Sequence, residues 1–353
     1  MALEHLGTPD APTFGLDTFG DRGTGPDGRQ VSHPEAVRQV VAEGELADQL
    51  GIDFFGVGEH HRDDFAVSAP DVVLAAIASV TERIRLGTSV TVLSSDDPVR
   101  VFERFSTLDA LSRGRAEVTL GRGSFTESFP LFGLRLEDYE VLFAEKLDLF
   151  ARVLEEKPVT WSGTIRPPLE GQPVYPPTES GRLPAWVGVG GTPTSVVRAA
   201  RYGLPLVIAV IGGSPAQFVP LADLYRQALA ELGKQPLPIS MHSPGHVAET
   251  DELAVEQMFP HQRDAFTRIG RERGWAPYTR QAFDSMTGPT GALFVGSPET
   301  VARKIAWAVG TLGLSRFQLK YSVGTLPNAE RLSSIRLYGE QVVPRVRELL
   351  AAS

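Results

Sequence analysis

Residues 188–195 have the composition expected of a site that holds an anion. Three glycines within four positions let the backbone turn sharply and let a bulky ligand come close to it. These glycines are Gly188, Gly190 and Gly191. Thr192 then has the residue type of a helix N-cap, and Pro193 suits the first helical position. The free N–H groups and dipole of that helix, with the hydroxyls of Thr192 and Ser195, predict a phosphate site that requires no lysine.

Two other interpretations of this segment stay open. It could be an ordinary turn between a strand and a helix. It could also be a dinucleotide fingerprint, but Pro193 stands where the third glycine of that motif belongs, and the segment lies in mid-chain rather than in a first βαβ unit. The pattern therefore favours a phosphate site over a nicotinamide dinucleotide site.

The adjacent residues His60 and His61 could bind a metal or transfer a proton. Adjacent histidines rarely aim at one ion, and no third ligand with metal-site spacing lies nearby, so we predict no metal site. An imidazole whose pKa is near neutrality can transfer a proton at physiological pH. Each histidine could equally be held by hydrogen bonds from neighbouring loops. His242 and His246 are weaker candidates for the same proton transfer.

The composition is that of a globular protein. The chain has 353 residues, of which 42% are hydrophobic and 22% are charged, enough for one large domain or two small ones. The absence of cysteine excludes thiol catalysis, disulfides and cysteine-ligated metal centres. A net charge of -9 argues against a nucleic-acid partner. The polar N-terminus does not resemble a signal peptide and no apolar run is long enough to span a membrane, so we expect a cytoplasmic protein.

Strands and helices alternate along the chain. Runs of β-branched and aromatic residues predict strands, and segments with one apolar face predict helices. The predicted strands are 14–19, 54–57, 84–93, 116–120, one from 185, 206–211, 239–243 and 317–321. The predicted helices are 32–50, 70–80, 98–111, 136–154, one from 194, 215–232 and 298–312. This alternation predicts one α/β domain over residues 1–353, a (β/α)8 TIM barrel with insertions at its C-terminal face, and a doubly wound sheet is the alternative.

Two segments do not fit this repeat. Residues 157–183 are rich in proline and are expected to lie on the surface. Residues 248–291 are polar, and we expect them to form a helical insertion over the barrel mouth. In a TIM barrel the loops that follow the strands form the active face, which would bring the two adjacent histidines, Arg122, the glycine segment and His242 together.

Several motifs together carry a resemblance to a known family. They are Gly58-Glu59-His60-His61, Arg85-Leu86-Gly87-Thr88-Ser89-Val90, Ser112-Arg113-Gly114-Arg115 and Gly121-Arg122-Gly123-Ser124. In this order, and over about the whole barrel, the chain resembles the bacterial luciferase-like flavin-dependent monooxygenase superfamily. The resemblance implies a (β/α)8 barrel that takes reduced FMN and, with molecular oxygen, inserts an oxygen atom into a small organic substrate. Some members of that superfamily use a deazaflavin coenzyme instead.

The resemblance also implies roles for individual residues. Arg122 aligns with the arginine that binds the flavin phosphate, although an arginine there could also make only a surface ion pair. Ser89 and Val90 correspond to a non-prolyl cis peptide beneath the flavin ring. His60 is the implied catalytic residue, near the reactive edge of the flavin. Some relatives carry an acidic residue where this chain has Gly191. The remaining cofactor-binding positions are Ser124, Gly190, Gly191, Thr192 and Ser195.

More than one function is compatible with these residues. The preferred hypothesis is an FMN-dependent monooxygenase that receives reduced FMN from a separate flavin reductase, because the chain lacks a convincing nicotinamide motif. A deazaflavin-dependent hydride-transfer enzyme and a non-catalytic flavin-binding protein are the alternatives. We also expect a homodimer through the helices 70–80 and 98–111. The apolar residues assigned to that interface are Val72, Val73, Ala76, Ile77, Val80, Phe102, Phe105 and Leu108.

Overall fold

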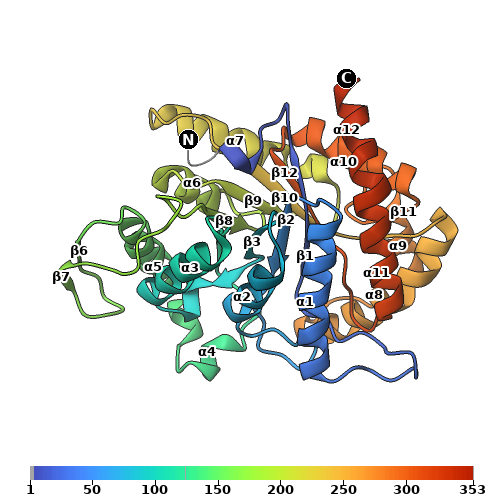
Figure 1. The fold of residues 1–353 in the computed structure, drawn as a ribbon, viewed down its shortest axis with the longest axis horizontal. Helices are drawn as coiled ribbons and strands as arrows, with labels where there is room; N and C mark the ends of the chain where they lie inside the picture. The colour runs from blue at the N-terminus through green and yellow to red at the C-terminus, as the bar shows by residue number, and fades with distance from the viewer. Residues whose placement is uncertain (1–3, 124, 353) are drawn as a thin grey trace.

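The computed structural model describes residues 4–123 and 125–352, and it has the predicted barrel architecture (Figure 1). Within these residues nine strands follow one another in the order β3-β2-β1-β12-β10-β9-β8-β5-β4, and β11 pairs with β10. All pairings in this sheet are parallel, and a parallel bridge between Leu86 and Ala116 joins its two ends. The strands are β1 (Thr13–Thr18), β2 (Phe54–Val57), β3 (Arg85–Thr88), β4 (Thr91–Val92), β5 (Val118–Gly121), β8 (Ala185–Val189), β9 (Leu206–Ala209), β10 (Ile239–Val247), β11 (Phe294–Gly296) and β12 (Arg316–Lys320). The sheet is thus nearly closed, and the alternative of a doubly wound sheet is wrong.

Helices surround the barrel (Figure 1). The helices are α1 (His33–Gln49), α2 (Pro70–Val80), α3 (Pro98–Ser112), α4 (Ser128–Leu131), α5 (Tyr139–Val153), α6 (Pro193–Tyr202), α7 (Val219–Glu231), α8 (Asp251–Arg273), α9 (Arg280–Thr287), α10 (Pro298–Leu312), α11 (Asn328–Leu337) and α12 (Val343–Ala351). The bounds of α2 and α10 coincide with the prediction, because each begins at a proline, which suits the first helical position. Helices α11 and α12 were not predicted from the sequence.

The third predicted strand is interrupted. Residues 84–93 were expected to form one strand, but the structure divides them into β3 and β4, followed by a 3-10 turn at Leu93–Ser95. The interruption lies at the Ser89-Val90 peptide, which is cis. β3 pairs with β2, whereas β4 pairs with β5, so the two halves of the segment form hydrogen bonds with different strands. The cis peptide implied by the resemblance is confirmed, whereas the continuous strand is wrong.

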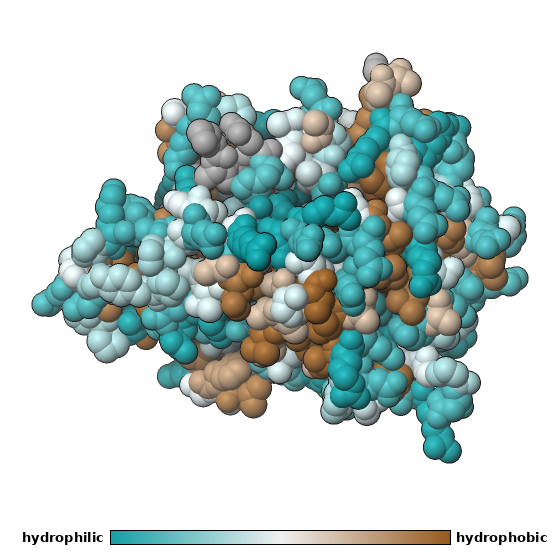
Figure 2. Space-filling view, viewed as in Figure 1, coloured by the Kyte–Doolittle hydropathy of each residue, from teal (hydrophilic) through white to brown (hydrophobic). Residues whose placement is uncertain are grey.

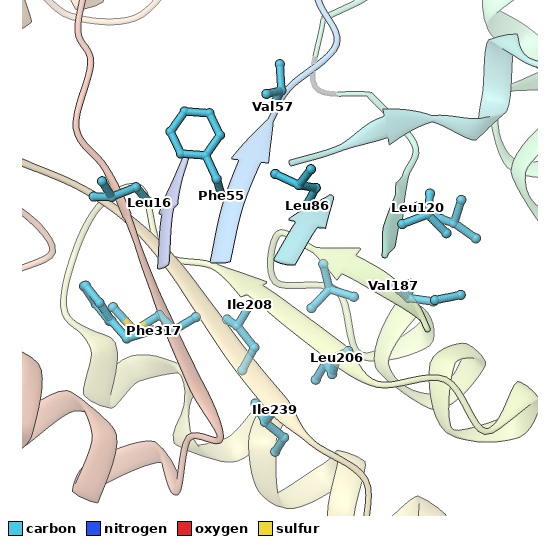
Figure 3. Close-up of a cluster of buried hydrophobic side chains, with 14 of the residues drawn as sticks. Leu16, Phe55, Val57, Leu86, Leu120, Val187, Leu206, Ile208, Ile239 and Phe317 are labelled. Atoms are coloured by element: carbon cyan, nitrogen blue, oxygen red, sulfur yellow. The ribbon is translucent and has the colours of Figure 1, made fainter. Parts of the chain in front are cut away.

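Buried apolar side chains fill the space between barrel and helices. Figure 3 shows a group of them from consecutive strands, including Leu16, Phe55, Leu120 and Phe317, each of which is fully buried. Alternate residues of a strand point to opposite faces, so the neighbours of these side chains in sequence face the barrel interior. Five phenylalanines, from β1, β2 and α3, are at most 2% exposed. They are Phe14, Phe54, Phe55, Phe102 and Phe105.

The N-terminal end of the barrel is plugged by a buried charge cluster. Arg316 Nη1 donates to Glu117 Oε2 at 2.8 Å, and Arg85 also pairs with Glu117. Burial alone would raise the pKa of Glu117, but Arg316 and Arg85 lower it to about 2. Above this layer lies the ring of Phe54, and a Cβ atom added at Gly87 would lie 2.8 Å from it. The interior is therefore filled at this end, and a ligand can enter only at the opposite mouth.

The two segments outside the repeat have regular structure. The insertion 248–291 contains α8 and α9, as predicted, and α8 packs against β10 and β11. The proline-rich segment 157–183 lies on the surface as expected, but it also holds an antiparallel hairpin that the sequence did not predict. Its strands are β6 (Val159–Trp161) and β7 (Leu169–Gln172), which protrude at the left of Figure 1. No helix in the described part of the chain combines the length and apolarity needed to cross a membrane.

The helices assigned to a dimer interface bury much of their apolar surface within one subunit. Five of the eight residues named for the interface are at most 7% exposed and pack in the core, so their assignment is wrong. They are Val73, Ile77, Phe102, Phe105 and Leu108. The outer face of α2 still presents Val72 and Val80, and α3 presents Leu111. Figure 2 shows apolar side chains gathered over α2, in the lower middle of the view.

Candidate active site

His60 follows β2 and lies in a box of aromatic rings. Its ring centroid is 4.5 Å from that of Phe19, 4.5 Å from that of Phe65 and 5.2 Å from that of Phe125. Burial in this box lowers the pKa of His60 to about 3. The imidazole is therefore uncharged at neutral pH. Our expectation of a pKa near neutrality is wrong, because three aromatic rings cover much of the side chain.

Glu59 and His61 hold the loop after β2 against β4. Glu59 Oε2 accepts a hydrogen bond from the Val92 N–H at 2.8 Å, and Glu59 Oε1 lies 3.0 Å from His61 Nε2. The Glu59 N–H donates to the Val90 carbonyl at 3.1 Å. His61 is thus held by a hydrogen bond, the alternative to a metal-binding or proton-transfer role. Its contact with Glu59 helps to position the loop that carries His60.

The Ser89-Val90 peptide lies half-buried at the barrel mouth among glycines. A Cβ atom at Gly121 would lie only 2.4 Å from a methyl group of Val90, and one at Gly58 would lie 2.8 Å from the Ser89 carbonyl oxygen. A Cβ at Gly188 would lie 3.1 Å from Val90. The glycines therefore allow three strand ends to close tightly around this peptide.

Arg122 and the glycine segment meet across the mouth, as predicted. Arg122 Nη2 donates to Thr192 Oγ1 at 3.3 Å, and the hydroxyls of Thr192 and Ser195 lie 2.8 Å apart. α6 begins directly after Thr192, whose side chain makes no capping hydrogen bond to the helix. Added Cβ atoms at Gly190 and Gly191 would meet nothing within 4 Å, so the space above this loop is open. Ser124, predicted as a further member, lies outside the described residues.

Two more charged side chains stand beside this loop. Glu140, in the first turn of α5, pairs through Oε1 with Arg122 Nη1. Its other oxygen, Oε2, lies 3.4 Å from Nη2 of Arg198 in α6. The surface ion pair that we considered for Arg122 thus exists, together with the contact to Thr192.

His242 faces the barrel interior. Ile239 and Met241 of β10 pack in the core under the helices, so His242 points to the other side of the sheet. Its Nδ1 lies 2.8 Å from Asp17 Oδ2, and its ring stacks at 6.0 Å on Phe19, which also contacts the His60 ring. The structure therefore brings both His242 and His60 to the ring of Phe19.

His246 is directed elsewhere. Its Nε2 lies 2.8 Å from Gln257 Oε1 in α8, and burial lowers its pKa. Among the described residues it makes no ring contact with the cluster around Phe19, unlike His242. His246 therefore serves the packing of the insertion.

Three segments meet over the mouth. Arg62 of the loop after β2 donates from Nη1 to Glu127 at 2.7 Å and from Nη2 to Glu272 at 2.6 Å, at the end of α8. The guanidiniums of Arg62 and Arg273 both lie 4.7 Å from the ring of Phe125, which contacts His60. A cavity of about 670 Å³ opens here. Its apolar lining consists of Phe125, Phe129, Pro130, Leu134 and Leu136.

The arrangement of these loops on the barrel agrees with a match to a protein-family model. The model of the luciferase-like monooxygenases matches residues 14–315. The chain belongs to this family. The family that the resemblance indicated is thus confirmed.

Solved structures of luciferase-like enzymes have the same fold. Monooxygenase RslO1 from Streptomyces bottropensis is 25% identical, with a TM-score of 0.81, and the match covers 94% of this chain and 99% of that one. The oxygenating constituent of 3,6-diketocamphane monooxygenase from Pseudomonas putida, in complex with FMN, is 18% identical with a TM-score of 0.75 over 95% and 99% of the two chains. An F420-dependent secondary alcohol dehydrogenase is 18% identical with a TM-score of 0.72 over 95% and 99%.

Sequence reasoning missed Glu140, Arg198 and Asp17. Arg198 follows Ser195 by three residues on a helix, so helical periodicity alone would have placed the two on one face. Asp17 and His242 are 225 residues apart, and only the closure of the barrel through β12 brings their strands close.

Proposed function

We propose that this protein is an FMN-dependent monooxygenase, which uses reduced FMN and molecular oxygen to oxidise a small organic substrate. The observation that carries the proposal is the meeting of Arg122 with Thr192 at the start of α6. A guanidinium, two hydroxyls and an uncapped helix N-terminus form a donor set that suits a phosphate. The open space above Gly190 and Gly191 leaves room for such a group.

The remaining residues fit a flavin in that orientation. Arg122, Thr192 and Ser195 would hold the phosphate, and the half-buried Ser89-Val90 peptide would contact the ring. Bound reduced flavin supplies the electrons with which oxygen is activated. The cavity beside Phe125 is lined by apolar side chains and by the charged residues Arg62, Glu127, Glu272 and Arg273, and a small organic substrate that filled it would keep water from the reaction.

The two histidines His60 and His242 have different roles in this proposal. His60, which is uncharged, would touch the flavin near its reactive edge and act as a hydrogen-bonding imidazole. His242 is oriented by Asp17, whose carboxylate accepts a hydrogen bond from Nδ1–H and leaves Nε2 as the basic nitrogen. That pair is suited to accept and return a proton.

The proposal includes the partners expected from the sequence. Reduced FMN would come from a separate flavin reductase, and the protein would act in the cytoplasm as a homodimer. A deazaflavin-dependent oxidoreductase is the second candidate, because the F420-dependent neighbour shares the fold. A flavin-binding protein without catalysis is the third.

Titrations with FMN, riboflavin and coenzyme F420, followed by absorbance, test the cofactor. FMN should bind more tightly than the other two. Arg122→Ala and Ser195→Ala should each weaken FMN by about 1.5–3 kcal/mol and leave riboflavin unchanged, because the lost contacts touch only the phosphate. Equal losses for both ligands would mean that the phosphate site is misplaced. Oxygen uptake with photoreduced FMN that never responds to organic substrates would favour the binding protein.

A further inference from the structure

The helix α5 holds two guanidiniums beside the glycine loop. The Arg122 guanidinium carbon lies 5.3 Å from the centre of the Tyr139 ring, and that of Arg198 lies 5.6 Å from the centre of the Phe143 ring. Tyr139 is itself fixed by a hydrogen bond to the Gly123 carbonyl at 3.0 Å. Two ring faces on one helix thus orient two positive charges, one from the loop after β5 and one from α6.

Glu140 lies between these two charges. It follows Tyr139 directly in α5, and its two oxygens face Arg122 Nη1 and Arg198 Nη2. The same Arg122 also contacts Thr192 through Nη2. The carboxylate therefore stands at the place where the donors of the phosphate site converge.

Arg198 has unused donor capacity at this position. Its side chain is only 16% exposed, and its Nη1 is buried without a hydrogen-bond partner among the described residues. A buried donor that lacks a partner is costly, so such an atom calls for an explanation. An acceptor with more oxygens than one carboxylate would supply the hydrogen-bond partner that Arg198 Nη1 lacks.

The charges indicate which acceptor this is. Arg122 and Arg198 carry two positive charges, and Glu140 offsets one of them. A phosphate monoester carries about 1.5 to 2 negative charges at neutral pH and has three acceptor oxygens, which matches both guanidiniums together. Phosphate and Glu140 at the same place would repel each other. The Glu140 side chain is 63% exposed, so it can turn into solvent at little cost.

From these contacts we infer that Glu140 occupies the position of the flavin phosphate in the ligand-free protein, and that Arg198 is a second phosphate-binding guanidinium. The inference rests on the proposed function and specifies how Glu140 limits the affinity of the cofactor site for FMN. Because Glu140 competes with the phosphate, FMN binds more weakly than the donor set alone would allow. Weaker binding suits a flavin that arrives reduced and leaves oxidised at each turnover.

Binding of FMN and of riboflavin to purified full-length variants, measured by fluorescence quenching, tests this inference. Glu140→Gln keeps the shape and removes the charge, so FMN should bind about three- to fivefold more tightly. Arg198→Gln should weaken FMN by about tenfold or more, because a charge-assisted hydrogen bond is lost. Neither change should alter riboflavin binding, which also reports that each variant is folded.

Two variants serve as matched controls. Glu155→Gln removes one carboxylate just beyond the opposite end of α5, about 20 Å away by the rise of the helix. Arg201→Gln removes one guanidinium from the exposed side of α6. Both should leave FMN and riboflavin affinities unchanged. If Glu140→Gln and Arg198→Gln behave like these controls while the native protein prefers FMN to riboflavin, the inference is overturned and the proposed function stands. If the native protein binds no FMN, both are overturned.

Discussion

Asp17 Oδ2 lies 2.8 Å from Nδ1 of His242 inside the barrel, and both side chains are buried. Because a carboxylate oxygen can only accept, Nδ1 is the donor in this hydrogen bond. The other ring nitrogen, Nε2, is then the basic one. The His242 side chain keeps an exposed fraction of 8%. Since the opposite end of the barrel is plugged, that exposure is toward the mouth, where His60 lies.

This pairing leads to a prediction about Asp17. Asp17→Asn can present its amide N–H₂ to Nδ1, which would shift the ring proton to Nε2 and remove the base. We expect the rate of substrate oxidation to fall about 10–100-fold, the usual loss when a group that orients a histidine is changed. His242→Gln should lose as much, and the double variant no more than either single one, because the two act as a unit. Losses that add in the double variant would contradict the pairing.

A second prediction concerns His60. His60→Asn keeps a hydrogen-bonding side chain, so FMN affinity should change by less than about tenfold, roughly 1.4 kcal/mol. The rate of substrate oxidation should fall by about 10²–10³, because the shorter amide cannot place its hydrogen-bonding group where the imidazole nitrogen lies. His33→Asn, at an exposed position on α1, is the matched control and should have no effect. An unchanged rate in His60→Asn would move the catalytic assignment to His242.

The low pKa of His60 also predicts a pH dependence of stability. Between about pH 3 and 6.5 the unfolded chain binds a proton at this histidine that the folded protein does not. The free energy of unfolding should therefore fall as the pH drops through this window, with a slope of up to about 1.4 kcal/mol per pH unit. Urea unfolding of the native protein and of His60→Asn should show a steeper pH dependence for the native protein. Parallel curves would mean that the histidine is hydrated in the folded state.

The parts of the site that depend on local sequence were predictable, and those that depend on distant contacts were not. Thr192, Pro193 and Gly203 mark the two ends of α6 by residue type alone, and the structure uses all three. By contrast, the pKa of His60 depends on rings from three separate segments. Nor do β-branched residues at 84–93 reveal that the strand changes partner at Ser89, because partner choice is a property of the closed barrel.

Lys304 in α10 provides a fourth prediction, at alkaline pH. Lys304 is 3% exposed, and among the described residues its Nζ donates to three carbonyls of the segment around α9 and to no carboxylate. These are Met286 O at 3.2 Å, Thr287 O at 3.2 Å and Leu293 O at 2.5 Å. Burial lowers the pKa of Lys304 to about 7 from the ordinary lysine value of 10.5. In the pH range between these values the unfolded chain binds the extra proton, so the free energy of unfolding should rise with pH.

Urea unfolding at pH 7.5 and pH 9 measures this effect. The native protein should gain on the order of 2 kcal/mol between these two pH values, since one proton is worth about 1.4 kcal/mol per pH unit. Lys304→Met removes the titrating group and should lose this gain. If the variant gains as much as the native protein, the ammonium of Lys304 is stabilised in the fold and its pKa is not lowered.

The last prediction concerns the proposed homodimer and uses the outer face of α2 and α3. Val72 is 64% exposed, Val80 is 47% exposed and Leu111 is 61% exposed. Val72 and Val80 are eight residues apart on α2, so they lie on one side of that helix, and α3 packs beside it. These side chains, with the exposed Ala76 between them, form an apolar strip that is available for a second copy of the chain.

A charge in this strip should separate the subunits. Val72→Asp would place a carboxylate against apolar side chains of the partner, and burying an unpaired charge is unfavourable. We expect the dimer to weaken by about tenfold or more, at least ~1.4 kcal/mol, while the subunit keeps its fold because Val72 lies outside its core. Leu232→Asp, at a position 48% exposed just after α7, is the matched control. Light scattering at micromolar concentration should show dimers for the native protein and the control and monomers for Val72→Asp. A native protein that is already monomeric, or a Val72→Asp variant that stays dimeric, would exclude this face as the interface.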